Sequence, residues 1–356
     1  MRQVLFYVPI HADSPLGPPG YVLMLLALGV FAVISLFLTW RRDEGFSPEF
    51  RTNLIFCSVV AIGIFVVGSG VVRWQGGLPI EQLPVFGYGA ALVAGVVGSM
   101  WVGGRRAKLV GVDPQFARDL TVWLVLSGVF GARLFHVIQH YERIFKGCQS
   151  LWDYVVAFFM LPDGGLTLYG GLILASLTYL WICHKHKVSA VRFADAAVPA
   201  VFVGITFGRL GCFLNGCCYG SRSDLPWAVS FPQGSAAWSA LVGRGFLPEN
   251  ALQTMSLHPT QIYSSINGLV LAVLTAAYYR YRKGDGSVVA LALIMYPLSR
   301  FGLEIIRWDE TGQLGTELTI SQFVSLGVVG LGLLLARWSW TRSAPQLPSD
   351  AAAATR

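Results

Sequence analysis

The chain has 356 residues, of which 54% are hydrophobic and only 13% are charged, and its mean hydropathy is +0.58. Soluble domains carry about a quarter charged residues, so this composition excludes an ordinary soluble protein. The net charge of +7 does not indicate a nucleic-acid surface, because Lys and Arg fall in short clusters between apolar runs. The pattern is typical of an all-α, polytopic membrane protein with no nucleic-acid partner.

Apolar segments long enough to span a bilayer as helices recur along the whole chain. We predict about nine of them, near residues 20–40, 53–72, 85–104, 119–138, 164–183, 195–213, 262–280, 287–306 and 318–336. The first segment lacks a basic n-region and a nearby cleavage site, so we expect a retained helix rather than a signal peptide. Residues 341–356 are expected to form a disordered tail.

The loops between these segments alternate in their content of Lys and Arg. One set holds 16 basic residues and the opposite set holds 7, with three more inside the spans. By the positive-inside rule the C-terminus is then cytoplasmic, and nine spans place the N-terminus outside. The loop 214–260 faces the periplasm or exterior. Its Trp227, Phe231, Trp238 and Phe246 are typical either of a segment at the lipid headgroups or of an ordinary ordered loop.

The sixth span carries an arginine within GITFGRLGCFLNGCCYG, residues 204–220. An arginine at apolar depth costs several kcal/mol unless it is paired or lines a polar cavity. The five glycines of this stretch allow a helix or a ligand to approach the backbone closely. A snorkelling arginine at a close-packed helix end is the structural alternative. The arrangement favours an anion site around Arg209 inside the membrane.

A second charged group lies in YPLSRFGLEIIRWDE, residues 296–310. Arg300, Glu304 and Arg307 are spaced i, i+4 and i+7, so one helix face presents all three charges. Glu304 can satisfy one arginine and leave the other available for an anion. A purely structural ladder of ion pairs is the alternative.

These motifs resemble those of the bacterial prolipoprotein diacylglyceryl transferases. GRLGCFLNGCCYG resembles the family signature G-R-x-G-N-F-x-N-G-E-x-x-G, with Cys212 in place of Asn and Cys217 in place of Glu. R-x-x-x-E-x-x-R also occurs in the family, where it is followed by a Pro-Asp pair rather than by Trp308 and Asp309. HPTQIY, which begins at His258, resembles H-P-[ST]-Q-x-Y-E, with Ser264 in place of the final Glu.

The resemblance extends over residues 80–340, through FGYGAAL around Tyr88, Arg133 in GVFGARLFHV and Asp195 in RFADAAVPA. It implies a seven-helix transferase-like domain over 80–340, preceded by an extension, 1–79, with two added helices. In GGLTLYGGL, residues 164–172, Tyr169 stands where a better-studied branch of the family has a His thought to matter for catalysis. A phenol is a poor general base at neutral pH unless a cation such as Arg209 or Arg300 activates it.

The six cysteines fall into two groups. Cys57 and Cys183 lie in or beside spans and are expected to be small hydrophobic residues. The others are on the outer side, where disulfides can persist. A disulfide from Cys148 to Cys212, Cys217 or Cys218 is one alternative there, and free thiols are the other. C-x4-C-C has no partner His or second Cys pair at zinc-like spacing, so we assign no metal site and expect no cofactor.

The resemblance implies transfer of the diacylglyceryl group of phosphatidylglycerol to the lipobox cysteine thiol of prolipoproteins, the first step of lipoprotein maturation. The enzyme would lie in the bacterial plasma membrane with its site facing outward. The implied catalytic residues are Arg209, Arg300, Glu304, Tyr169 and His258, and the implied substrate-binding residues are Arg209, Asn215, Tyr88, Gly220 and Arg307. Tyr169 and His258 are the candidates for proton handling. The alternatives are a diverged member that uses another thiol or only binds lipid, and an anion transporter.

Overall fold

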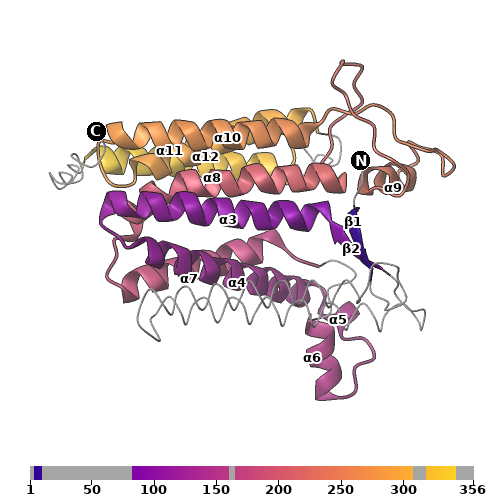
Figure 1. Cartoon of the computed structure of the whole chain (residues 1–356), viewed down its shortest axis with the longest axis horizontal. Coiled ribbons are helices and arrows are strands. Elements are labelled where there is room, and N and C mark those ends of the chain that lie inside the picture. Colours follow the sequence, from indigo (N-terminus) through magenta and orange to yellow (C-terminus); the bar gives the residue numbers. More distant parts are fainter. Residues whose placement is uncertain (1–3, 10–81, 160–164, 308–317, 342–356) are drawn as a thin grey trace. The chain divides into compact units, whose positions relative to one another are not determined.

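A computed structural model of the chain describes residues 4–9, 82–159, 165–307 and 318–341 (Figure 1). The predicted spans 20–40 and 53–72 and nearly all of the predicted tail lie outside these residues. The elements are β1 (Val4–Pro9), β2 (Gln82–Phe86), α3 (Gly87–Ala107), α4 (Pro114–Gln139), α5 (Tyr141–Ile144), α6 (Leu151–Phe159), α7 (Leu168–Lys185), α8 (Ala190–Asn215), α9 (Ala236–Gly243), α10 (Thr260–Tyr278), α11 (Ser287–Ile305) and α12 (Ile320–Trp340).

Six of the described helices are long and apolar enough to cross a membrane, namely α3, α4, α8, α10, α11 and α12. Each coincides with a predicted span, so the described part is that of a polytopic membrane protein. The span predicted at 164–183 corresponds to α7, which begins at Leu168, has 18 residues and ends in His184 and Lys185, and it is not among the six. The total of nine spans stays a prediction.

A short antiparallel ribbon was not predicted. β1 pairs with β2 in a register that runs from Val4 opposite Phe86 to Pro9 opposite Gln82, with an irregularity between Val4 and Phe6. The all-α prediction therefore holds for the described residues apart from this ribbon. Short apolar runs do not distinguish strand from helix, and the two partners here are separated by more than 70 residues of sequence.

The boundaries of α4 show how local sequence sets a helix end. The helix begins at Pro114 rather than near residue 119, because Asp113 caps it: Asp113 Oδ1 accepts from the Gln115 backbone N–H at 2.9 Å. Proline is well suited to the first helical position, where its missing N–H costs nothing. The Asp-Pro pair was thus a readable start signal.

The chain forms two compact units. The first unit draws on residues 1–99, 201–274 and 292–332, and the second on residues 100–200, 275–291 and 333–356. In the first unit α3 packs on α8, where Gly95 approaches Phe207 and Gly98 approaches Val203. Close approach at small residues is how membrane helices gain packing energy in the absence of a hydrophobic driving force.

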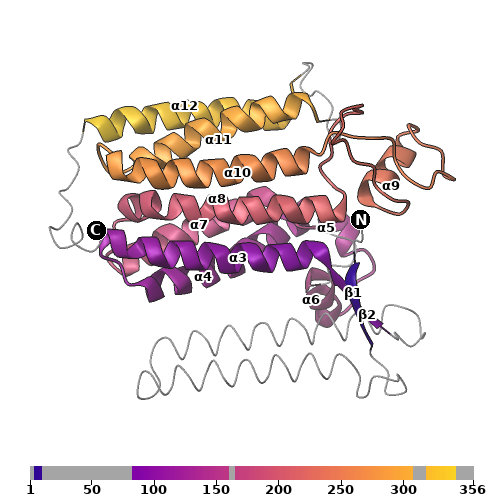
Figure 2. The same cartoon turned by 45° about the horizontal axis from the view of Figure 1, so that its top comes forward.

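The larger parts of α10, α11 and α12 also belong to the first unit, and Figures 1 and 2 show these three helices side by side. The Phe202 ring of α8 lies 5.9 Å from the Tyr296 ring of α11. Ser265 of α10 donates a hydrogen bond to the Thr206 carbonyl of α8 at 3.0 Å. Residues of α8, α10 and α11 therefore converge inside this unit.

The loop between α8 and α10 folds into a small core of its own around α9. Its buried residues are Tyr219, Phe231, Ala237, Leu241 and Leu257. Ser235 caps α9 by accepting from the Trp238 N–H. Of the aromatic residues predicted at the headgroups, Phe231 is instead 1% exposed in this core, whereas Trp227 is 56% exposed. The interior of this segment is therefore an ordered loop with a core of its own, as the second of the two predictions stated.

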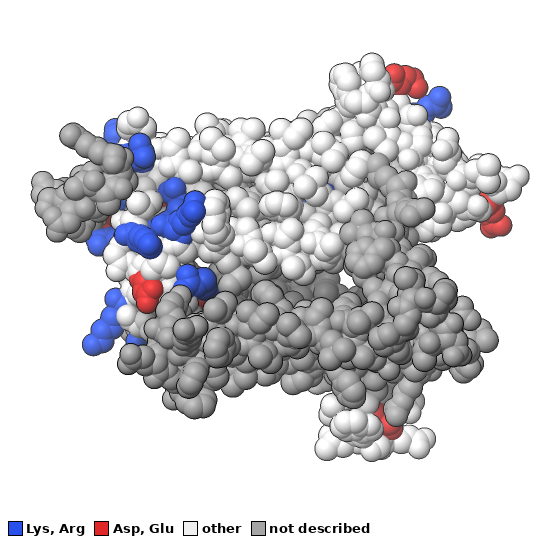
Figure 3. All heavy atoms as spheres, in the orientation of Figure 1, with Lys and Arg blue, Asp and Glu red and all other residues white. Residues whose placement is uncertain are grey.

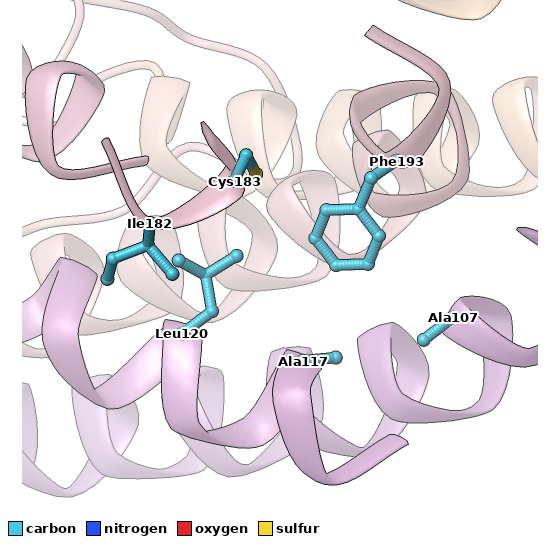
Figure 4. Close-up of a cluster of buried hydrophobic side chains, with 6 residues drawn as sticks. All are labelled: Ala107, Ala117, Leu120, Ile182, Cys183 and Phe193. Carbon is cyan, nitrogen blue, oxygen red and sulfur yellow. The ribbon is translucent and has the colours of Figure 1, made fainter. Parts of the chain in front are cut away.

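The second unit has an apolar core from α3, α4, α7 and α8 (Figure 4), formed by Ala107, Ala117, Leu120, Ile182, Cys183 and Phe193. Cys183 is fully buried there, which confirms its expected role as a small hydrophobic residue. α4 and α7 cross closely, since a Cβ at Gly131 would lie 2.5 Å from the Gly170 carbonyl oxygen. Gly170 of the GGLTLYGGL motif is therefore a packing residue.

Polar groups of the second unit hold helix ends in place. The buried Asp195 carboxylate accepts from the backbone N–H groups of Gly286, Val288 and Val289 at 2.8 to 3.0 Å, where α11 begins. Arg106 donates to the Ala196 carbonyl at 2.8 Å and stacks on Tyr279. Figure 3 shows Lys and Arg side chains gathered over the ends of α3, α10 and α12 in this unit.

Candidate active site

Arg209 lies on α8 and lines a pocket in the first unit. The other residues of this pocket are Ile205 on α8, Ser264 and Asn267 on α10, and Tyr296, Arg300 and Leu303 on α11. Among the residues that the structure describes, no carboxylate pairs with Arg209, and its guanidinium interacts with the Tyr296 hydroxyl. The two arginines that sequence analysis selected from different helices thus meet in one pocket.

The predicted contact between Glu304 and an arginine is present, but the carboxylate contacts both arginines rather than leaving one available, and Arg307 lies beyond the end of α11. Arg300 Nη1 lies 2.8 Å from Glu304 Oε2, and Arg307 Nη1 lies 3.5 Å from the same oxygen. The Glu304 side chain is 1% exposed, and its Oε1 accepts from the Thr319 hydroxyl at 3.3 Å. One buried carboxylate therefore fixes both arginines, because a buried charge is tolerated only when it is paired and hydrogen-bonded.

Gly220 marks a junction of three backbone segments. Its N–H donates to the His258 carbonyl at 3.0 Å, and it forms an isolated bridge with Arg307. A Cβ at this position would lie 2.6 Å from His258 Cβ and 2.9 Å from the Ile306 carbonyl oxygen. Glycine is thus required for close approach, and this junction places the backbone of His258 and the backbone of Arg307 beside Gly220.

His258 lies two residues before α10 and is partly buried. Its Nδ1 is 3.4 Å from the Tyr263 hydroxyl, and that hydroxyl accepts from Trp227 Nε1 at 2.7 Å. The imidazole is therefore positioned by a neighbouring side chain, an arrangement compatible with either proton handling or a local structural role.

The end of α8 turns back on itself after Asn215. Gly216 has φ +75°, its N–H donates to the Phe213 carbonyl, and the Cys217 N–H donates to the Cys212 carbonyl at 3.1 Å. These two bonds are those of a Schellman motif, which brings the second residue past the cap into contact with the last helical turn. Here that contact places Cys217 beside Cys212.

Three thiols gather at this turn. The sulfur atoms of Cys212, Cys217 and Cys218 all lie within 4.8 Å of one another, and all three are partly buried free thiols. Hydrogen bonds from Cys212 and Cys217, and the charges of Arg307 and Arg209, lower the pKa of the Cys218 thiol. Cys148 is also a free thiol, so the open bridge to it is not formed here.

Tyr88 and Asn215 lie beside the same turn. A Cβ at Gly211 would lie 3.0 Å from Tyr88 Cδ2, so the Tyr88 ring rests on the bare surface of α8. The Asn215 side chain interacts with the Cys217 thiol. Both residues were predicted to position substrate, and both lie in the first unit with Arg209.

Tyr169 lies in the second unit, in the first turn of α7, and is 47% exposed. The backbone before it is fixed by the Thr167 N–H, which donates to the Ala132 carbonyl of α4 at 3.0 Å. Its role in proton handling stays a prediction.

Sequence reasoning missed three pocket residues. Tyr296 and Ser264 were read only as parts of motifs, and Asn267 was not selected, although it donates to the Ser299 hydroxyl at 2.8 Å and thereby links α10 to α11. A polar residue one turn from Ser264 on an otherwise apolar helix was the available signal.

Comparison with known proteins identifies the family of this chain. A sequence model of the family described as "Prolipoprotein diacylglyceryl transferase" matches residues 77–338. The phosphatidylglycerol–prolipoprotein diacylglyceryl transferase of Clostridium tetani is 30% identical over 71% of this chain and 92% of its own length. The enzyme of the same name from Rhodopirellula baltica is 28% identical over 95% of this chain and 89% of its own length. That of Corynebacterium efficiens is 31% identical over 66% of this chain and 72% of its own length. On this evidence the chain belongs to the prolipoprotein diacylglyceryl transferase family.

Proposed function

We propose that the pocket around Arg209 binds the phosphate of phosphatidylglycerol, and that this chain transfers its diacylglyceryl group to the lipobox cysteine of prolipoproteins. The relatives named above carry this activity in their names, at about 30% identity over most of the chain. The observation that carries the site assignment is the presence of Arg209 and Arg300 in one pocket. Guanidinium groups bind phosphate oxygens in a planar, bidentate way without a metal.

The reaction suits these residues. The thiolate sulfur forms a bond to the glycerol carbon of the diacylglyceryl group while the bond from that carbon to the phosphate oxygen breaks. Glycerol phosphate leaves with the additional negative charge, and the thiol proton must be taken up by a base. Arg209 and Arg300 stabilise the departing phosphate, and a charge-stabilising donor in a water-poor site contributes roughly 10²–10³-fold in rate.

The remaining residues divide into supporting roles. Glu304 orients Arg300 and Arg307, and its burial keeps both guanidinium groups from rotating away. Tyr88 and Asn215 position the lipid or the peptide at the end of α8, and Gly220 holds the junction that carries His258. Tyr169 and His258 are the proposed proton-handling groups.

The proposed location is the bacterial plasma membrane, with the loop 214–260 outside and the C-terminus in the cytoplasm. The distribution of Lys and Arg supports this orientation. Reporter fusions after Ser189 and Lys283 should then report a cytoplasmic position, and fusions at Gly234 an external one. A cytoplasmic signal at Gly234 would reverse the orientation and remove access to exported prolipoproteins.

The function is tested in two assays. The full chain should restore growth of a bacterium depleted of its own transferase, and the purified protein in phosphatidylglycerol vesicles should convert a lipobox peptide to its thioether, detected by mass spectrometry. A peptide with Ser in place of the lipobox cysteine is the control. If the unaltered protein binds phosphatidylglycerol but transfers nothing to the lipobox peptide, the chain is a diverged, lipid-binding member of the family instead.

A further inference from the structure

The three thiols at the end of α8 form a cluster that the transfer reaction does not use. Their sulfur atoms lie within 4.8 Å of one another. Cys212 lies in the last turn of α8, whereas Cys217 and Cys218 follow the end of the helix. The Schellman turn at Gly216 produces this convergence, and Cys218 adopts φ +60°, a conformation that non-glycine residues rarely take. A backbone conformation of this kind persists only where the surrounding structure holds it, and such positions cluster at functional sites.

The backbone of the cluster is held in place by α10. The Thr260 hydroxyl donates to the Cys218 carbonyl at 2.7 Å, and Gln261 Nε2 donates to the Cys217 carbonyl at 2.8 Å. Both donors are buried. Outer hydrogen bonds of this kind orient the side chains that bind a metal ion and narrow the geometries that they can adopt.

The size of the cluster fits one metal ion. With metal–sulfur bonds of about 2.3 Å, three sulfur ligands around a single ion lie about 4 Å apart. Sulfur atoms that already lie within 4.8 Å of one another need only small side-chain rotations to reach that spacing. The positively charged guanidinium groups of Arg209 and Arg307 both interact electrostatically with the Cys218 thiol. Positive charge is therefore available to offset the negative charge of several thiolates.

We propose that Cys212, Cys217 and Cys218 bind one thiophilic, monovalent d¹⁰ metal ion of the Cu(I) class as three thiolates. Soft thiolate ligands select such ions. Among the described residues, no further His, Cys, Asp or Glu belongs to the group, whereas structural Zn(II) sites use four ligands. On binding, each thiol releases its proton and the oxidation state of the metal does not change.

The test uses the full-length protein in detergent, reduced and then loaded with Ag(I), a redox-inert stand-in for Cu(I). After passage over a competing thiol resin, elemental analysis should find one silver ion per chain. Cys212→Ser/Cys217→Ser/Cys218→Ser should retain less than a tenth of this amount, and Cys148→Ser, which changes another free thiol, should retain all of it. Parallel loading with Zn(II) should leave no ion bound after the same resin.

A second measurement covers the case in which the triple variant does not fold. In the unaltered protein, Ag(I) should protect Cys212, Cys217 and Cys218, but not Cys148, from alkylation located by peptide mass spectrometry. Retention of Zn(II) instead of Ag(I), equal retention by the triple variant, or equal alkylation with and without Ag(I) would each overturn the proposal. So would a disulfide within the cluster that re-forms in air in the presence of Ag(I), since that outcome identifies a redox pair.

Discussion

The two units of the molecule hold their buried charges in different ways. In the second unit the Asp195 carboxylate accepts from three backbone N–H groups, and Arg106 donates to a backbone carbonyl. In the first unit Glu304 is shared by two arginine side chains, one of which lines a pocket with Arg209. A charge that is satisfied by backbone groups fixes a helix end, whereas charges shared among side chains beside a pocket can exchange a partner for a ligand.

Arg133 of the second unit and Arg209 of the first unit differ in the same way, although both lie in an apolar helix one or two residues after a glycine. Arg133 donates from Nε to the Phe158 carbonyl at 2.7 Å and from Nη2 to the Ala157 carbonyl at 3.0 Å, so it binds the end of α6. Arg209 lines the pocket instead. An arginine at membrane depth is therefore not by itself evidence for an anion site. The groups around the guanidinium show whether it binds backbone carbonyls or lines a pocket.

The largest expected effect comes from removing the pocket arginine. Arg209→Ala should leave no detectable lipid transfer, because the departing phosphate loses its main source of positive charge. Arg209→Lys should rescue poorly, since an ammonium group cannot make the bidentate contact. Transfer is measured with a lipobox peptide in phosphatidylglycerol vesicles.

The control is Arg222→Ala, which removes an exposed arginine of the same unit and should keep full activity. Full activity in folded Arg209→Ala protein would contradict the assignment of the phosphate site.

Tyr169 tests whether a residue of the second unit takes part in the reaction. Tyr169→Phe keeps the ring and removes the hydroxyl, so it should lower the transfer rate by roughly 10²–10⁴-fold if the hydroxyl moves a proton. The same vesicle assay measures this rate.

If instead Tyr169→Phe is nearly normal and only Tyr169→Ala loses activity, the ring serves packing. Proton handling would then pass to His258 or to solvent.

Glu304→Gln tests whether the shared carboxylate holds the first unit together. Removing one partner of a buried pair leaves guanidinium charges uncompensated, so we expect a loss of about 3–5 kcal/mol in unfolding free energy. Denaturant unfolding in detergent gives this value, and the transfer rate should fall with it. A variant as stable as the unaltered protein would show that Arg300 and Arg307 have sufficient partners without Glu304.

Asp195→Ala is the matched change in the second unit and has the smallest expected effect. It leaves the first backbone N–H groups of α11 without their acceptor, at a cost of about 1–3 kcal/mol. The transfer rate per folded molecule should not change. A fall in that rate with unchanged stability would mean that Asp195 acts on the reaction as well.

Hydropathy and local spacing predicted much of the fold. Every predicted span from residue 85 onward corresponds to a helix, because an apolar run of this length has few other solutions in a membrane. The contact of Glu304 with Arg300 followed from their i, i+4 spacing on α11, whereas Arg307 lies beyond the end of that helix and its contact with the same carboxylate was not predicted. These features depend on residues that are near one another in the sequence.

Features that depend on distant pairs were not predicted. The meeting of Arg209 with Asn267 and Tyr296 requires knowledge of how three helices pack. The thiol cluster was set aside because C-x4-C-C has no zinc-like spacing, yet Gly216 allowed the chain to reverse and place Cys217 beside Cys212. A glycine that ends a helix lets the chain reverse, so residues such as Cys212 and Cys217, which helical spacing alone would not pair, come into contact.

The β1–β2 ribbon has a consequence for the site. Because Pro9 pairs with Gln82 and β2 continues directly into α3 at Gly87, the strand at residues 4–9 is held beside the start of α3. α3 in turn packs against α8, the helix that carries Arg209, through Gly95 and Gly98. A substitution that breaks the ribbon would therefore act on the pocket through the position of α3, although no residue of the ribbon lines that pocket.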